Sequence, residues 1–348
     1  METKAHGRFD FIDLLKGLGI FLVVWGHTMT PRSVFIYSFH MPLFFFISGY
    51  LHRNKPIQEF FIGKIKRLLI PYALVTVLSW LFYLVVIIIQ GNSEQLTIHL
   101  PKIASLFTGS ARNGGNDPIW FLTCLFVVSA LFWLYQNFLK DDKRIAVVIA
   151  AGSLIGYLLG AARILLPFKI DAAFSGLVFY FGGYLLRKRS DLTTLDKLGK
   201  PIVIITVALC LVAQFILARF NVALTGIPKV SMISNNLGNY FLFYITAVLG
   251  IAALLVFGYR VRTIPVYNSL GKHSLSILAT HKPILFLLGE LFDDILDIAS
   301  PAYCFLGSII AILINMSLVG LATLLGRYLP DFFGTKNPSP LSGGVHGL

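Results

Sequence analysis

Residues 11–30 read FIDLLKGLGIFLVVWGHTMT, an apolar stretch with three ionisable side chains, Asp13, Lys16 and His27. About 20 apolar residues in a helix cross the hydrocarbon core of a bilayer, so the stretch predicts a membrane-spanning helix. No small-residue cleavage site follows it, and we expect the helix to be retained rather than removed as a signal peptide.

The rest of the chain has the same character. Of its 348 residues, 56% are hydrophobic and 13% are charged. Soluble domains carry about 25% charged residues, so most of the surface is predicted to face lipid. The fold class is therefore all-α, a polytopic integral membrane protein with about ten transmembrane helices. They are expected at 11–30, 34–51, 69–90, 118–138, 145–162, 172–187, 201–220, 237–258, 270–289 and 302–326. One transmembrane domain covers 1–330, and a short mobile tail covers 331–348.

The basic residues predict the orientation. The chain carries a net charge of +13, and placing both termini in the cytoplasm puts 21 of its 29 Lys and Arg residues on that side. The positive-inside rule favours this orientation. The basic residues form no separate basic domain, so nucleic acid is not an expected partner. Cys124, Cys210 and Cys304 stand apart without a CxxC pattern, which supports neither disulfides nor a zinc site.

Ionisable residues inside the apolar stretches are the functional candidates. Lys16 and His27 lie eleven residues apart, which places them on one helix face about 16 Å apart along the axis. His40 in the second helix and His281 in the ninth are expected at a depth similar to His27, in the outer half of the bilayer. The three histidines predict a polar cavity rather than a metal site, because no Asp or Glu clearly shares their depth. Taken singly, Lys16 could be an interfacial lysine and His27 a packing residue.

Two further groups flank this cavity. Lys64 and Arg67, three residues apart, are expected on one helix face, as a phosphate clamp or as an ordinary positive-inside cluster. Ser48, followed by Gly49, allows either close helix packing or a slot for a thin pantetheine arm. Near the outer mouth, Asp117, Trp120 and Asn236 are of types that bind sugars, although Trp also belongs to the interfacial belt.

These residues occur in an order that resembles the membrane acyltransferase 3 family. Asp13-x-x-Lys16 followed by His27 is similar to the family's R/K-x10-H signature, and the likeness covers residues 8 to about 325. Lys16 stands where many members have Arg, which keeps the charge and loses the bidentate fork. The other motifs are Phe45-Phe46-x-Ser48-Gly49, Lys64-x-x-Arg67-x-x-x-Pro71, Trp120-Phe121-Leu122 and Ser276 to His281, and Phe39–Phe44 resembles the fucose 4-O-acetylase branch.

The resemblance implies transfer of an acyl group, by default acetyl, from cytoplasmic acyl-CoA to a surface or lipid-linked glycan. His27 is then the catalytic residue and general base, and His281 or Trp120 is a candidate donor to the oxyanion. The expected site is catalytic at His27, Asp13 and His281, donor-binding at Lys16, Lys64, Arg67 and Ser48, and acceptor-binding at His40, Trp120, Asp117 and Asn236. No metal is expected. Membrane lipid, a second copy of the chain or polysaccharide synthesis machinery are the other expected partners, and the family implies a bacterial inner membrane.

Two other classes remain open. A transporter or flippase of a polysaccharide or lipid-linked sugar also needs many helices around a polar cavity. Against it, the sequence shows no pair of interrupted helices in matching halves. A membrane scaffold without chemistry would leave the buried histidines unexplained.

Overall fold

The computed structural model describes residues 2–28, 33–109, 115–190, 192–292 and 301–325, and within these ranges the chain is built from helices without a strand. The longer helices are α1 (Glu2–Gly26), α3 (His40–Tyr50), α4 (Ile57–Lys64), α5 (Ile70–Ile89), α8 (Trp120–Phe138), α9 (Asp142–Ala161), α10 (Ile170–Arg189), α11 (Lys200–Thr225), α12 (Tyr240–Val261), α13 (Pro265–Lys272), α14 (Ser274–Phe292) and α15 (Pro301–Leu325). Short helices are α2 (Ser33–Tyr37), α6 (Ser93–His99) and α7 (Ser105–Thr108), and the 3₁₀ turns include η4 (Asp117–Ile119). The predicted tail over 331–348 lies outside the described residues.

The all-helical prediction is confirmed, and each of the ten expected stretches contains helix. Six helical segments of the described chain are long and apolar enough to cross a membrane: Ser33–Tyr50, Ile57–Ile89, Asp117–Phe138, Asp142–Ala161, Lys200–Thr225 and Tyr240–Val261. These segments mark an integral membrane protein. Ten crossings and cytoplasmic termini stay predictions.

Two of the expected stretches are interrupted, contrary to the sequence-based expectation. The second stretch divides into α2 and α3, with Ser38 and Phe39 between them, and the ninth divides into α13 and α14 at His273. As a result, His40 is the first residue of α3 and His281 lies within α14, whereas one continuous helix was expected for each stretch. The third stretch begins earlier than expected, because α4 continues through the π-helical turn η1 (Ile65–Leu69) into α5.

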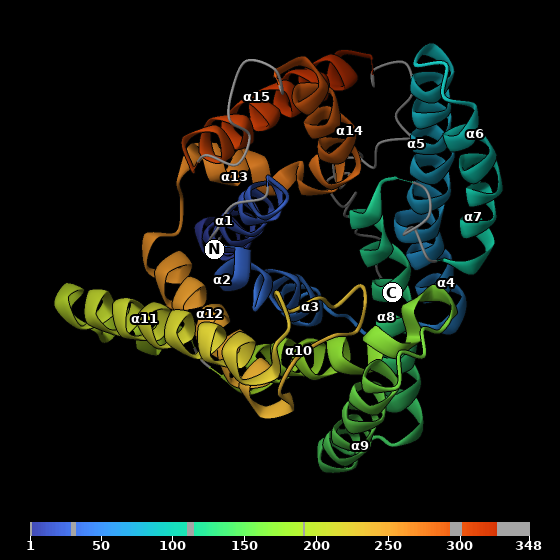
Figure 1. Cartoon of the computed structure of the whole chain (residues 1–348). Helices are drawn as coiled ribbons and strands as arrows, with labels where there is room; N and C mark the ends of the chain where they lie inside the picture. Colours follow the sequence, from blue (N-terminus) through green and yellow to red (C-terminus); the bar gives the residue numbers. More distant parts are fainter. Residues whose placement is uncertain (1, 29–32, 110–114, 191, 293–300, 326–348) are drawn as a thin grey trace, which may run out of the picture.

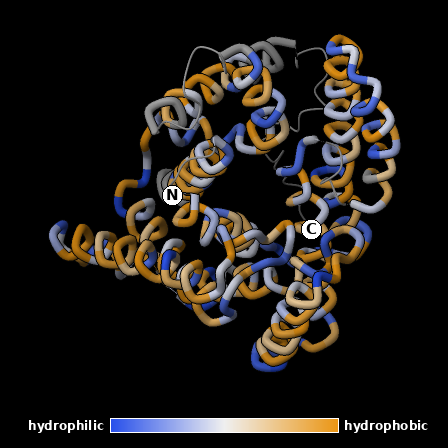
Figure 2. The backbone as a smooth tube through the Cα atoms, viewed as in Figure 1, coloured by the Kyte–Doolittle hydropathy of each residue, from blue (hydrophilic) through white to orange (hydrophobic). Residues whose placement is uncertain are grey.

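The N-terminal helices form the middle of the molecule. Figure 1 shows α1, α2 and α3 at the centre, with α5, α8, α10, α12, α14 and α15 arranged around them. The outlying α11 packs on α12 and leaves large apolar side chains such as Ile204 and Leu209 exposed. Apolar residues run along this helix in Figure 2. Such a surface is stable in lipid and costly in water.

The part of α1 around Asp13 and Gly17 is held by close contact with α13. A Cβ atom at Gly17 would lie 1.8 Å from the carbonyl oxygen of Tyr267, and one at Gly271 would lie 1.8 Å from that of Asp13. Both positions therefore require glycine, as small residues do at tight membrane helix pairs. Asn268 Nδ2 also donates to the carbonyl oxygen of Asp10 over 2.6 Å. This contact fixes the helix that carries Lys16 and leads to His27.

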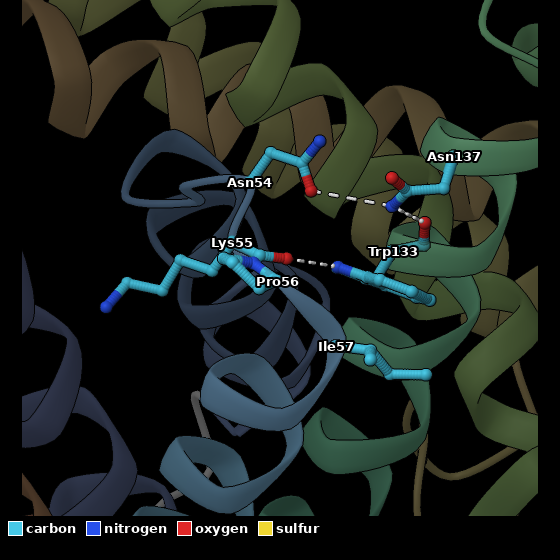
Figure 3. Close-up of a pocket in the computed structure, with 6 residues that line it drawn as sticks. All are labelled: Asn54, Lys55, Pro56, Ile57, Trp133 and Asn137. Carbon is cyan, nitrogen blue, oxygen red and sulfur yellow. Dashed lines mark hydrogen bonds between the residues drawn. The ribbon is translucent and has the colours of Figure 1, made fainter.

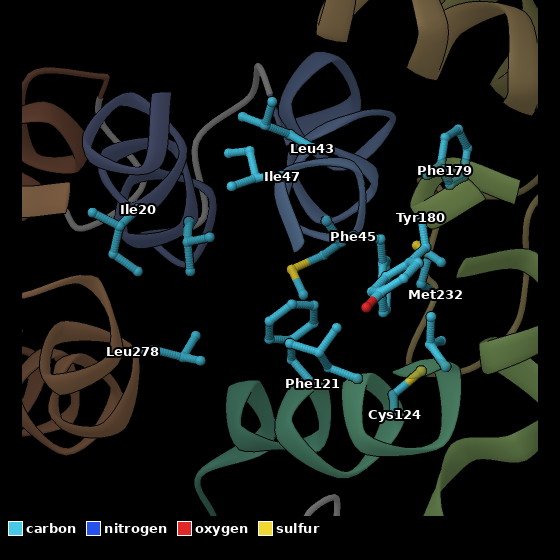
Figure 4. Packing of buried hydrophobic residues seen from close by; sticks show 14 of the residues in the cluster. Ile20, Leu43, Phe45, Ile47, Phe121, Cys124, Phe179, Tyr180, Met232 and Leu278 are labelled. Atoms are coloured by element: carbon cyan, nitrogen blue, oxygen red, sulfur yellow. The ribbon is translucent and has the colours of Figure 1, made fainter. Parts of the chain in front are cut away.

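The position of α3 is set by aromatic packing against α8 and α10. Phe45 of α3 meets Phe121 of α8 with ring centroids 5.0 Å apart, and Tyr180 of α10 is fully buried beside them (Figure 4). Because rings of this size dominate core packing, the helix has little freedom to slide. His40 at its start is placed by this packing.

Candidate active site

His27 follows the last residue of α1 and continues its helical hydrogen bonding. Its backbone N–H donates to the carbonyl oxygens of Val23 and Val24, and its ring Nδ1 lies 2.7 Å from the Val23 carbonyl oxygen. The side chain is half-buried. It therefore stands at the end of the central helix with one face accessible.

The structure brings the three predicted histidines together. The rings of His27 and His281 have centroids 5.1 Å apart. Tyr37 of α2 joins the third, since its ring lies 6.0 Å from that of His27 and 5.0 Å from that of His40. We refer to His27, Tyr37, His40 and His281 as the histidine cluster.

All three rings are held in the same tautomer. Nδ1 of His40 lies 2.8 Å from the Ile36 carbonyl oxygen, and Nδ1 of His281 lies 2.9 Å from that of Ile277, which repeats the arrangement at His27. A carbonyl oxygen only accepts, so each Nδ1 carries the proton and each neutral Nε2 carries a lone pair. The cluster presents bases, and a neutral His281 cannot donate from Nε2 to an oxyanion. The sequence-based suggestion of that role for His281 therefore holds only for its protonated form.

Two buried acceptors beside the cluster have no hydrogen-bond partner among the described residues: Nε2 of His281 and Oδ1 of Asn116. Asn116 Nδ2 donates to the Ser79 hydroxyl oxygen at 3.0 Å and to the Ala279 carbonyl oxygen at 2.7 Å. It thereby ties α5 to α14 two residues before His281. Unsatisfied buried acceptors are costly, and they mark a place where a ligand's hydroxyl groups could donate.

Sequence analysis missed the contribution of α15. Ser308 lies 3.1 Å, oxygen to oxygen, from the hydroxyl of Thr28, which follows His27 directly. Asn315 accepts from the hydroxyl of Thr280, which precedes His281. Ser308 and Asn315 are both fully buried and are seven residues apart, two turns along one face of an apolar helix. That spacing was the available signal.

The predicted acceptor residues are placed less closely than the histidines. Asp117, in η4, acts electrostatically on Tyr37 of the cluster. Trp120 is buried at the start of α8, where its ring contacts Phe121. Asn236 is exposed, and its backbone pairs with Ser231. The described contacts give Trp120 and Asn236 no direct link to the histidines, and their roles stay predictions.

The donor-binding candidates lie on α1, α3, α4 and the π-helical turn η1. Lys16 pairs with Asp13 over 3.5 Å, and both are half-buried. Lys64 is half-buried and donates to the Ser129 hydroxyl oxygen at 2.9 Å, whereas Arg67 is exposed. Arg67 lies within η1, and a π-turn rotates the chain less per residue than an α-turn. The charge of Arg67 nevertheless acts on Lys64, and the shared helix face stays a prediction. Ser48 is half-buried beside Gly49, which packs on the α10 backbone.

A second polar group, which sequence analysis also missed, is centred on His52 just after α3. His52 Nε2 donates to Gln136 Oε1 and its Nδ1 accepts from the Tyr180 hydroxyl, each over 2.9 Å. Gln136 donates to the Tyr184 hydroxyl oxygen at 3.2 Å, and Tyr180 is also bonded to Ser129, the acceptor of Lys64. Burial lowers the pKa of His52 to about 4. We call Lys64, Ser129, Tyr180, His52 and Gln136 the His52 chain.

Neither a metal site nor the surface pocket coincides with the histidine cluster. In the described part of the chain, no three His, Cys, Asp or Glu side chains are grouped to hold a metal ion. Figure 3 shows an open pocket between the loop after α3 and helix α8, where the Trp133 indole donates to the Lys55 carbonyl oxygen over 2.9 Å. Its lining carries no histidine, so we do not assign chemistry to it.

The fold and this site define a helical membrane protein with an internal group of bases. The family model described as an acyltransferase domain matches residues 9–320. The chain therefore belongs to the acyltransferase 3 family, and it is a membrane acyltransferase. Comparison with curated proteins gave no match, and comparison with solved structures gave none.

Proposed function

We propose that the protein transfers an acyl group, by default acetyl, from acyl-CoA to a hydroxyl of a surface or lipid-linked polysaccharide, with His27 as general base. The observation that carries the proposal is the His27–His281 pair, with rings 5.1 Å apart and both Nδ1 protons committed to backbone carbonyls. This arrangement leaves a lone pair on each Nε2, as a base needs.

The proposed step is a direct transfer. Nε2 of His27 takes the proton of the acceptor hydroxyl as that oxygen attacks the thioester carbonyl carbon. The carbon–sulfur bond then breaks, and the imidazolium returns the proton to the departing thiolate, which gives coenzyme A and the ester. Asp13, paired with Lys16 at 3.5 Å, orients the lysine toward the donor.

Hydroxyl-rich acceptors fit the unpartnered groups. His281 Nε2 and Asn116 Oδ1 are buried acceptors without partners in the described residues, and neighbouring hydroxyls of one sugar could donate to both. A sugar that satisfies them would be oriented with a third hydroxyl at His27. His40, Asp117, Trp120 and Asn236 complete the proposed acceptor side.

The donor is proposed to enter from the other end of the bundle. Lys16, Lys64 and Arg67 would bind the phosphates of acyl-CoA, since Lys and Arg form the strong charge-assisted bonds that phosphate accepts. Ser48 would line the pantetheine arm. Both termini are then cytoplasmic on ten membrane crossings, in a bacterial inner membrane, and the fucose 4-O-acetylase branch remains our narrower assignment. Membrane lipid, a second copy or polysaccharide synthesis machinery are proposed partners.

The transporter alternative is not favoured by the family match. The interrupted helices at Phe39 and His273 remove one sequence argument against it, but a transporter gives no reason for three bases in one tautomer. The family assignment and the site chemistry point the same way.

The test is transfer of labelled acetyl from acetyl-CoA to the host's surface polysaccharide by purified protein in lipid. We expect His27→Ala to lower the rate about 10²–10⁴-fold. His99→Ala is a matched control, because His99 is a buried histidine held by the Trp80 carbonyl oxygen at 2.9 Å on the α5–α6 hairpin. Full activity of His27→Ala, or equal loss in both variants, would refute the role of His27.

A further inference from the structure

Two lysines at the rim of the histidine cluster are not used by the proposed reaction. Lys229 lies in the 226–239 connection, and its Nζ stands 3.8 Å from the centroid of the Tyr37 ring. That ring contacts both His27 and His40. Lys282 directly follows His281 on α14, and its charge acts on His27 and on Lys229. The two ammonium groups therefore lie near the bases and near each other.

Lys229 is held in place by its connection. Ser231 and Asn236 pair through two backbone hydrogen bonds of 2.8 and 2.9 Å. Asn221 donates to the Leu237 carbonyl oxygen at 3.0 Å, and Asn235 donates to that of Gly156 at 2.7 Å. Val230, next to Lys229, is buried in the core. These hydrogen bonds and the buried Val230 hold the connection, and with it Lys229, in a fixed position.

The charge around the pair is unbalanced. Both lysines are half-buried, and neither forms a salt bridge with a carboxylate of the described residues. Burial and the nearby ammonium of Lys282 lower the pKa of Lys229. Among the carboxylates of the described residues, Asp117 acts on Tyr37, and it has interactions of its own. Two like charges held together out of water favour an added anion.

We propose that Lys229 and Lys282 bind an anionic group of the acceptor, a carboxylate or a phosphate, and thereby place its hydroxyl at His27. This inference rests on the proposed function and narrows its acceptor to an acidic glycan. The anion would sit between the two ammonium groups, while neighbouring hydroxyls reach the unpartnered Nε2 of His281. A neutral sugar would leave both charges uncompensated.

The test measures binding rather than turnover. The full chain in nanodiscs of zwitterionic lipid is titrated calorimetrically with methyl glucoside, methyl glucuronide and glucose 1-phosphate. We expect both anionic sugars to bind at least about tenfold more tightly than the glucoside. Lys229→Gln and Lys282→Gln should each reduce that preference, and the double variant should abolish it. Lys229→Arg should retain it, and Lys102→Gln, on the α6–α7 segment, should not change it.

Three results would overturn the inference: equal binding of the charged and neutral sugars, a preference that survives in the double variant, or a preference that disappears when anionic lipid replaces part of the zwitterionic lipid. The last would assign the lysines to a lipid headgroup. Acetyl transfer in the same preparations separates the two proposals. Charge-dependent binding without transfer to any acceptor keeps the anion site and removes the proposed function. Equal transfer to glucoside and glucuronide keeps the function and removes the site.

Discussion

The two ends of α3 carry two buried polar groups that differ in how fully they are bonded. At its start, the histidine cluster leaves the Nε2 of His281 without a partner among the described residues. After its end, both ring nitrogens of His52 are bonded, and the chain continues through Tyr180 to Ser129 and Lys64. The tautomers are opposite as well, since His52 carries its proton on Nε2 and the cluster histidines carry theirs on Nδ1.

This difference distinguishes a polar group that can bind a ligand from one that stabilises the fold. A saturated buried network rigidifies the fold, and both ring nitrogens of His52 are already bonded within the protein. An unsatisfied one costs stability, and that cost is typical of sites that must receive a ligand. Histidine burial alone would not distinguish the two ends; the bonding of Nε2 does.

The largest effect is expected when the acyl-transfer rates and stabilities of His27→Gln and His52→Leu are compared. His27→Gln should lower acyl transfer about 10²–10⁴-fold and leave the unfolding temperature nearly unchanged. His52→Leu should leave the rate of the folded protein within a few-fold, while stability falls by about 1–3 kcal/mol for each of the two partners left unsatisfied. Transfer rates and thermal unfolding in detergent are measured on both. The comparison fails if His52→Leu abolishes transfer without loss of stability.

The next effect is a pH dependence of stability that belongs to His52. Burial lowers its pKa to about 4 in the folded protein, whereas an unfolded histidine titrates near pH 6.5. Below pH 6.5 the unfolded chain therefore binds more protons, and stability is lost as pH falls from about 6.5 to about 4. The loss is about 3 kcal/mol for this residue.

The stability of His52→Gln should lack the part of the pH dependence that His52 contributes. Unfolding temperatures of the wild type and the variant between pH 4 and pH 7.5 measure the difference. Parallel curves for wild type and variant would show that His52 titrates as it does in the unfolded chain. The variant is needed because other buried histidines also respond to acid.

The sequence predicted the histidine cluster because depth in a membrane follows from residue count along a helix. His27, His40 and His281 could be placed at one level without any knowledge of side-chain contacts. The His52 chain could not be predicted in this way, since its partners Tyr180 and Gln136 lie 128 and 84 residues further along the chain. Pairings of that kind depend on which helices become neighbours.

Local irregularities were the other limit. The π-helical turn η1 contains Arg67, and it changes the rotation between Lys64 and Arg67 from the one that α-helical spacing assumes. The break at Phe39, by contrast, leaves His40 in the histidine cluster, with its ring centroid 5.0 Å from that of Tyr37. Periodicity therefore predicted where helices lie better than it predicted their interruptions and the π-turn.

A smaller effect concerns Asn116, the second unsatisfied group near the cluster. Asn116→Ala removes the Oδ1 acceptor and should raise the acceptor KM by about tenfold, the share of one hydrogen bond. Ser79→Ala is the matched control, because it removes a partner of Nδ2 and leaves Oδ1 in place. Its acceptor KM should stay within about twofold of wild type. Equal KM values for both variants would mean that Asn116 acts through helix packing and not through the ligand.

The smallest effect separates the two cations of the donor side. Arg67 is exposed, so Arg67→Gln should raise the acyl-CoA KM no more than about fivefold, and the effect should vanish at high salt. Lys64 is half-buried and bonded to Ser129, so Lys64→Gln should raise the same KM with little dependence on salt. Lys66→Gln, which removes an exposed charge beside Arg67, is the control. If it matches Arg67→Gln at every ionic strength, the donor responds to the summed charge of this end of the bundle, and the specific contact proposed for Arg67 is wrong.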